Sequence, residues 1–190
     1  HSVAGDVRPI FAAGIDIDNA SSITINASGT TSIGYIAGED TDSSDGTTPL
    51  ATLDLNGTAG LSSGGELPDT LTLIDASGVA GTVSFTVEEP ETNGVPLKII
   101  GSAGGSSIEL HDIAEGDISS ISGAGPITLT IGDADTSWAA DDVVDLSSTS
   151  LANVTSVVLT DNATLQITLA QADVIGASHI KLAAGADNAT

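Results

Sequence analysis

The regular return of short apolar runs is the feature that most constrains how this chain can fold. Runs rich in Ile, Val, Leu and Thr recur along its whole length, and each is bounded by Gly, Ser, Asn, Asp or Pro, which favour turns. Alternation of apolar and polar residues predicts β-strands, because successive side chains of a strand point to opposite faces. The predicted strands span residues 21–28, 51–58, 69–77, 81–87, 97–101, 106–113, 126–132, 154–160, 164–170 and 179–185.

Helical patterns are confined to two short segments, SWAADDVV at residues 137–144 and AQADVIGA at residues 170–177. Strands this short, separated by turns this frequent, are typical of sandwiches, barrels and solenoids. The chain is therefore predicted to be all-β.

Internal similarity distinguishes among these folds. LDLNGTAGL (53–61), LIDASGVAGTVSF (73–85) and VDLSSTSLANVTSVVL (144–159) each combine an apolar run, a turn of small residues and a further apolar run. Each unit is too small to bury its own apolar face, whereas stacked units would share one core. We predict a parallel β-solenoid, with a β-sandwich as the alternative, in a single β-rich module over residues 1–190 that is part of a larger or polymeric protein.

The composition excludes several classes of protein. Hydrophobic residues make up 40% of the chain but aromatic residues only 2%, so the core must consist of Ile, Leu, Val and Ala. The chain has no Cys, which excludes disulfides and thiolate metal sites. Its 26 acidic residues oppose 3 basic ones, for a net charge of −23. This charge disfavours nucleic acid and anionic membranes and favours divalent cations.

No apolar run is long enough to span a membrane, so membrane insertion is not expected. The first residues lack the charged and apolar regions of a signal peptide, and we expect any such segment to have been removed or to lie upstream.

Two acidic segments are the candidate metal sites, because calcium binds clustered carboxylate oxygens. GEDTDSSDGTT is not an EF-hand, since Ala51 stands at the position of the terminal glutamate; a looser calcium site and a solvated loop both remain open. GDADTSWAADD surrounds Trp138 and reads either as a cation site or subunit contact, or as a loop whose Trp caps the core. The candidate ligands are Glu39, Asp40, Asp42, Asp45, Asp133, Asp135, Asp141 and Asp142.

Catalytic motifs are not evident in the sequence. His111 and Asp112 could belong to a triad, but adjacent residues of a strand point to opposite faces. There is no nucleophile elbow, P-loop, zinc-ligand spacing or dinucleotide fingerprint. We therefore expect that the protein is not an enzyme.

Six of the seven Asn residues begin an Asn-x-Ser/Thr triplet, which is more than chance predicts. Glycosylation of an exterior protein would explain the excess. Repeated turn chemistry, with Asn at positive φ before a strand that starts with Thr, would explain it equally. The six are Asn19, Asn26, Asn56, Asn153, Asn162 and Asn188.

The stretch GSAGGSSIE (101–109) partly follows the calcium-binding nonapeptide, a glycine-rich turn with one aspartate. Gly101, Gly104 and Ile108 fall on the pattern, while Ser102 replaces the second glycine and Ser106 the aspartate. Without that carboxylate, this copy is predicted to turn the chain without binding calcium strongly.

With its surroundings, this stretch resembles bacterial surface-layer proteins and large secreted adhesins of the RTX type, over residues 69–190. The resemblance implies an extracellular, cell-surface location, a β-solenoid, calcium-dependent assembly and no catalysis. The expected function is that of a structural, self-assembling module of a surface layer, filament or adhesin, with calcium as its ion and further copies of itself as partners. Two alternatives remain: a module that binds surface glycans, and a glycosylated, salt-adapted archaeal surface or filament protein.

Overall fold

More than half of the residues that the structure describes lie in short strands. The structure is a computed structural model that describes residues 2–3, 14–17, 20–38, 49–90, 94–132, 142–184 and 186.

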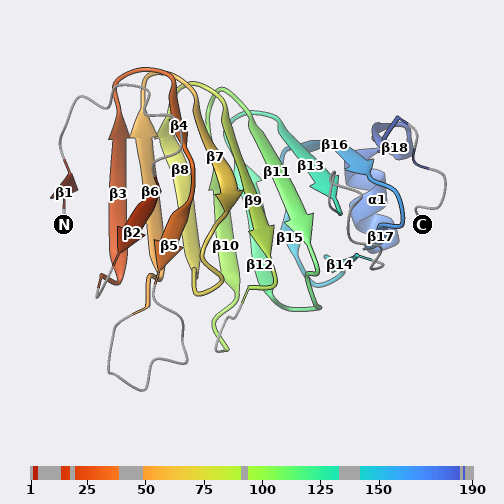
Figure 1. Ribbon diagram of the computed structural model, residues 1–190. Coiled ribbons are helices and arrows are strands. Elements are labelled where there is room, and N and C mark those ends of the chain that lie inside the picture. Colours follow the sequence, from red (N-terminus) through yellow and green to blue (C-terminus); the bar gives the residue numbers. More distant parts are fainter. Residues whose placement is uncertain are drawn as a thin grey trace.

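Two seven-stranded sheets form the body of the molecule, and every strand pairing in them is parallel (Figure 1). The first sheet contains β1 (Ser2–Val3), β3 (Ser22–Ala27), β6 (Thr52–Gly57), β8 (Leu73–Val79), β10 (Leu97–Gly101), β12 (Ile118–Gly123) and β15 (Ser150–Leu151). The second contains β4 (Thr31–Ile33), β7 (Leu61–Glu66), β9 (Val83–Glu88), β11 (Ser106–His111), β13 (Ile127–Ile131), β16 (Val154–Leu159) and β18 (Ile180–Leu182).

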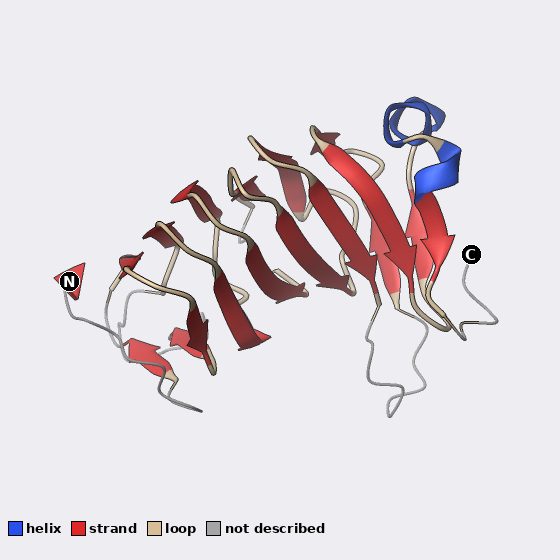
Figure 2. Cartoon of the chain, turned by 90° about the horizontal axis from the view of Figure 1, so that it is seen from above, coloured by secondary structure: helices blue, strands red, loops and turns tan. Residues whose placement is uncertain are grey.

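The chain passes from one sheet to the other with nearly every strand, and each pair of strands stacks on the pair before it (Figure 2). Neighbouring coils are accordingly linked by side-chain hydrogen bonds, and the two bonded residues are separated in the sequence by 21, 22, 23 or 28 positions. This is the predicted parallel β-solenoid. A β-sandwich is built from antiparallel sheets, so that alternative is excluded.

Alternating burial explains why these segments are strands. In β13, Ile127, Leu129 and Ile131 are fully buried, while the two threonines between them are half-buried on the outer face. The buried side chains stack in register from coil to coil: Leu53, Ile74, Ile99 and Ile121 follow one another across the first sheet. Phe85, Ile108, Leu129 and Val157 do the same across the second. Burial of each such side chain contributes about 1.5–3 kcal/mol.

Stacked alanine–glycine pairs form the corners at which the chain leaves the first sheet. A Cβ on Gly81 would lie 2.4 Å from the carbonyl carbon of Ala59, and one on Gly104 would lie 2.5 Å from that of Gly81. Since Cβ atoms do not approach backbone this closely, only glycine fits. We call the pairs Ala59-Gly60, Ala80-Gly81, Ala103-Gly104 and Ala124-Gly125 the corner column.

The stretch 101–109 forms one of these corners, so its predicted role as a turn is confirmed. Ser106, at the aspartate position of the nonapeptide, accepts a hydrogen bond through Oγ from the Ser102 backbone N–H at 3.0 Å. The Ser102 hydroxyl in turn donates to the Gly105 carbonyl at 2.6 Å. Both serines are buried, and their side chains close the corner.

A short helix lies at the C-terminal end of the stack and overlaps one of the two segments predicted to be helical, residues 170–177. It is α1 (Leu169–Ile175), followed by η1 (Ala177–His179). Thr168 and Gln171 form a capping box, and the Gln171 side chain donates to the carbonyls of Leu146 at 2.6 Å and Thr149 at 2.7 Å. These bonds fasten the helix to the last coil.

The other segment predicted to be helical, 137–144, lies outside the described residues up to Asp141. Its last two residues belong instead to β14 (Val143–Asp145), which pairs with β17 (Thr164–Gln166). A second small sheet pairs β2 (Ile15–Ile17) with β5 (Ile36–Gly38). Neither helical segment in the described part of the chain has the length and apolarity that a membrane crossing requires.

Candidate functional site

The predicted acidic ligands are mostly outside the part of the chain that the structure describes. This holds for Glu39, Asp40, Asp42 and Asp45 in one segment and for Asp133, Asp135 and Asp141 in the other. Asp142 is described and precedes β14, where its carbonyl accepts a hydrogen bond from the Thr164 N–H at 2.8 Å. Its carboxylate lies beside Gly132, 3.1 Å from where a Cβ on that glycine would be. The proposed calcium ligation at these positions therefore stays a prediction.

A different cluster of metal-binding residue types lies at the ends of three neighbouring strands of the second sheet. Glu66 is the last residue of β7, Glu88 of β9 and His111 of β11. One potential ligand atom from each residue lies within 4.8 Å of the others. We call these three residues the strand-end cluster.

Register and turns hold the strand-end cluster together. His111 is paired directly with Glu88 in the parallel ladder between β11 and β9. The next residues along the chain, Glu89 and Asp112, adopt φ angles of 35° and 44°, so both strands turn sharply just after the cluster. The Glu89 N–H donates to the His111 carbonyl at 3.3 Å, which keeps the two turns side by side.

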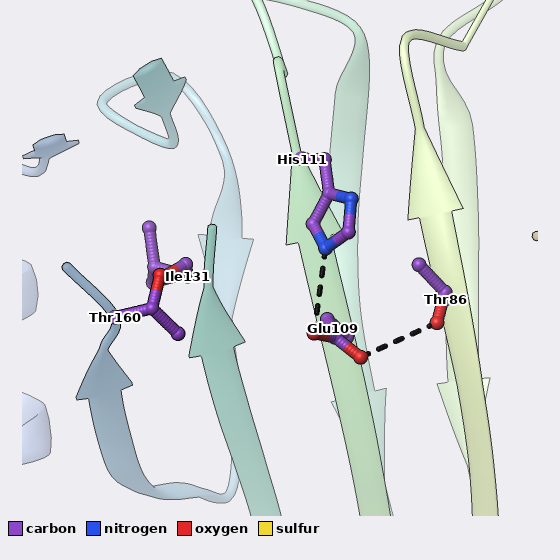
Figure 3. A network of polar contacts seen from close by, with 5 residues as sticks. All are labelled: Thr86, Glu109, His111, Ile131 and Thr160. Atoms are coloured by element: carbon purple, nitrogen blue, oxygen red, sulfur yellow. Dashed lines mark hydrogen bonds and ion pairs between the residues drawn. The ribbon is translucent and has the colours of Figure 1, made fainter. Parts of the chain in front are cut away.

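His111 is the most buried member of the cluster, with its side chain 10% exposed. Its Nε2 lies 3.4 Å from Oε1 of Glu109, which shares the outer face of β11 (Figure 3). The other carboxylate oxygen of Glu109 accepts a hydrogen bond from the Thr86 hydroxyl at 3.4 Å. Glu109 and Thr86 therefore support one side of the imidazole.

Burial raises the pKa of Glu88 to about 7, and a hydrogen bond and the negative charge of Glu66 add to the shift, while His111 opposes it. Burial is the largest cause because it disfavours the charged form, and Glu66 adds to it because two carboxylates at close range cannot both ionise at low cost. Near neutral pH the pair readily holds one proton or another cation.

The outer face of the same sheet carries a continuous row of hydroxyl groups. Neighbouring strands place their hydroxyl residues in register, so that one hydroxyl follows another at the strand spacing of about 4.8 Å. A shallow depression beside the row is lined in part by Thr82, Gly105 and Pro126. The name hydroxyl row is used below for these six residues: Ser32, Ser62, Ser84, Ser107, Thr128 and Ser156.

The Asn-x-Ser/Thr triplets divide between two structural settings. Asn153 and Asn162 both have a φ of 61°, and the Asn153 side chain donates to the Gly123 carbonyl at 2.6 Å, so turn chemistry accounts for these two. Asn26 and Asn56 instead pair with each other inside the first sheet. Asn19 and Asn188 lie outside the described residues.

Sequence reasoning missed the strand-end cluster and considered His111 only with its neighbour Asp112. A carboxylate or imidazole at the end of successive strands was the available signal. It could not be used, because the coils differ in length and the register between them is not readable from the sequence.

The described part of the chain is a parallel β-solenoid, and the histidine–carboxylate cluster lies at one row of its strand ends. Comparison with protein-family models, with curated proteins and with solved structures finds no match to this chain.

Proposed function

We propose that this chain is a stiff structural module of a secreted cell-surface protein, which assembles with further copies of itself and has no catalytic role. The observation that carries the proposal is the pair of parallel sheets around one aliphatic core, since each coil contacts its neighbours along its full length. The large negative charge supports an exterior location where calcium is available to neutralise it.

The C-terminal end of the described stack supports assembly between copies. Among the described residues, β18 is the last strand of the second sheet and pairs only with β16, so its other edge offers backbone groups with which a further strand could pair. Large apolar side chains are exposed nearby: Leu169 is 87% exposed and Val174 70% on α1, and Leu182 is 52% exposed on β18. An apolar end next to an open strand edge favours end-to-end contact with another copy.

Light scattering of the purified chain over a range of concentrations tests this proposal. We expect the wild type to form particles larger than a monomer, and the double variant Leu169→Ser, Val174→Ser to shift toward the monomer without a loss of thermal stability. Val95→Ser is the matched control, because Val95 is 57% exposed but lies in the turn before β10. A wild type that stays monomeric at every concentration, or equal effects of the two changes, would contradict assembly through this end.

The hydroxyl row supports a second candidate function, the binding of a surface glycan. Regularly spaced hydroxyl groups along a sheet face can exchange hydrogen bonds with sugar hydroxyls along an extended chain. A polysaccharide co-sedimentation assay with Ser107→Lys, in the middle of the row, tests it. Ser122→Lys on the first sheet is the control. Loss of binding in the first variant alone would support glycan binding, and equal binding by both variants would argue against it.

A further inference from the structure

We propose that the strand-end cluster Glu66, Glu88 and His111 is a binding site for a divalent transition-metal ion of the zinc type. The geometry is close to what such an ion needs. Ligand atoms at about 2.0–2.2 Å from a tetrahedral zinc lie about 3.4 Å apart, and the three candidate atoms already lie within 4.8 Å of one another.

The ligand atoms must move closer together to bind an ion, and Glu66 and Glu88 are the two side chains best able to move. Glu66 is exposed and Glu88 is half-buried, so both can rotate without disturbing the core, and an ion can enter from solvent. His111, the least exposed of the three, provides the fixed ligand. Water completes the coordination, as is usual at sites with three protein ligands.

The donor set selects the class of ion. Calcium and magnesium take oxygen ligands, whereas one imidazole nitrogen with two carboxylates suits zinc and the neighbouring first-row metals. This distinguishes the strand-end cluster from the acidic segments at 39–45 and 133–142, where the candidate ligands are carboxylates alone.

Glu109 contacts the imidazole of His111 and supports the ring orientation that the proposed metal site requires. A carboxylate commonly contacts one ring nitrogen of a metal-binding histidine and so fixes the other nitrogen as the ligand. Here Glu109 lies 3.4 Å from Nε2, and Figure 3 shows Nδ1 turned to the side of β9, the strand that ends in Glu88. A proton on Nε2 facing Glu109 leaves the Nδ1 lone pair for the ion. A divalent charge would also relieve the repulsion between Glu66 and Glu88.

Calorimetric titration of the full chain with zinc chloride tests the site, in buffer that contains millimolar calcium to occupy sites made of carboxylates alone. We expect wild type to bind one zinc ion in this way, and Glu66→Gln to weaken that binding at least tenfold. Glu115→Gln, at an exposed position outside the cluster, should bind within twofold of wild type. Glu66→Gln is preferred to His111→Asn as the test variant. Glu66 is exposed, so its variant should fold normally, whereas His111→Asn changes a buried side chain.

The nitrogen ligand is checked by 15N NMR of the histidine rings during the same titration. Coordination should move the Nδ1 resonance of His111 strongly and leave that of His179, whose Nδ1 contacts the Ile175 carbonyl at 2.9 Å, nearly unchanged. Three outcomes would overturn the proposal: no zinc binding in the presence of calcium, equal affinities of the Glu66→Gln and Glu115→Gln variants, or a shift of His179 without one of His111.

Discussion

Glu88 is the last residue of β9, and its carboxyl group is hydrogen-bonded to that of Glu66. Burial raises its pKa to about 7, so in the absence of a bound cation the folded chain takes up a proton that the unfolded chain releases at its ordinary pKa of 4.5. Folded protein therefore binds more protons than unfolded protein between these two values, and stability must fall as the pH rises through that window.

We predict that, in chelator, the free energy of unfolding decreases between about pH 4.5 and about pH 7. Because Glu88 is only half-buried, screening by solvent limits the loss to about 1 kcal/mol. Glu88→Gln should remove this part of the pH dependence, and Glu115→Gln should retain it. Denaturant unfolding at a series of pH values measures both, and an unchanged slope in Glu88→Gln would show that other groups are responsible.

Gly104 is a second residue whose role depends on its neighbour in the preceding coil. We predict that Gly104→Ala lowers the free energy of unfolding by about 1–3 kcal/mol, because the added Cβ would lie 2.5 Å from the carbonyl carbon of Gly81. Gly29→Ala is the matched control, since nothing lies within 4 Å of a Cβ there. Thermal unfolding compares them; similar melting temperatures would mean that the corner column can move apart at little cost.

At the scale of the element, sequence pattern predicted those strands whose own residues alternate. β10 and β13 match their predicted segments closely, because fully buried residues alternate with less buried ones along each strand. β7 and β12, with the sequences LSSGGE and ISSISG, were not predicted. Their serines and glycines favour turns locally, and pairing with strands on both sides outweighs that preference. The same dependence on partners explains why the strand-end cluster could not be predicted: its members meet only once three coils are in register.

Gln171 holds the helix α1 in position, because it caps the helix and bonds it to the last coil. We predict that Gln171→Ala costs about 1–2 kcal/mol, since it removes half of the capping box and two hydrogen bonds to the last coil. Asp173→Ala, at an exposed position on the same helix, is the control. Hydrogen exchange should show faster exchange in β16 and β18 and unchanged exchange in β6 and β8. Equal acceleration in all four strands would mean that the solenoid opens as one unit.

The whole molecule combines a largely aliphatic interior with a chain of high negative charge. Stacked apolar rows can stabilise the coils irrespective of pH, but 26 acidic residues against 3 basic ones repel one another across the surface. Cations reduce this repulsion, either by general screening or by binding at defined places. The sequence predicted the fold class and the charge balance at this scale, because both are sums over many residues.

We predict that millimolar calcium raises the melting temperature by several degrees over chelator at the same ionic strength, because ions that bind only the folded chain stabilise it. Calorimetric or fluorescence melting curves provide the measurement, and sodium chloride at matched ionic strength provides the control. Equal melting temperatures in the two solutions would assign the effect of the charge to screening alone.

The parallel stacking of coils also decides how the molecule would respond to mechanical load. β1 and β18 lie at opposite ends of the stack, so the hydrogen bonds between neighbouring strands run roughly along the line that joins them (Figure 1). Tension applied across these ends would open the bonds of one coil at a time, as in a zipper, rather than shear a whole sheet at once. A tether of this kind would lengthen in steps at modest force and dissipate work with each coil released.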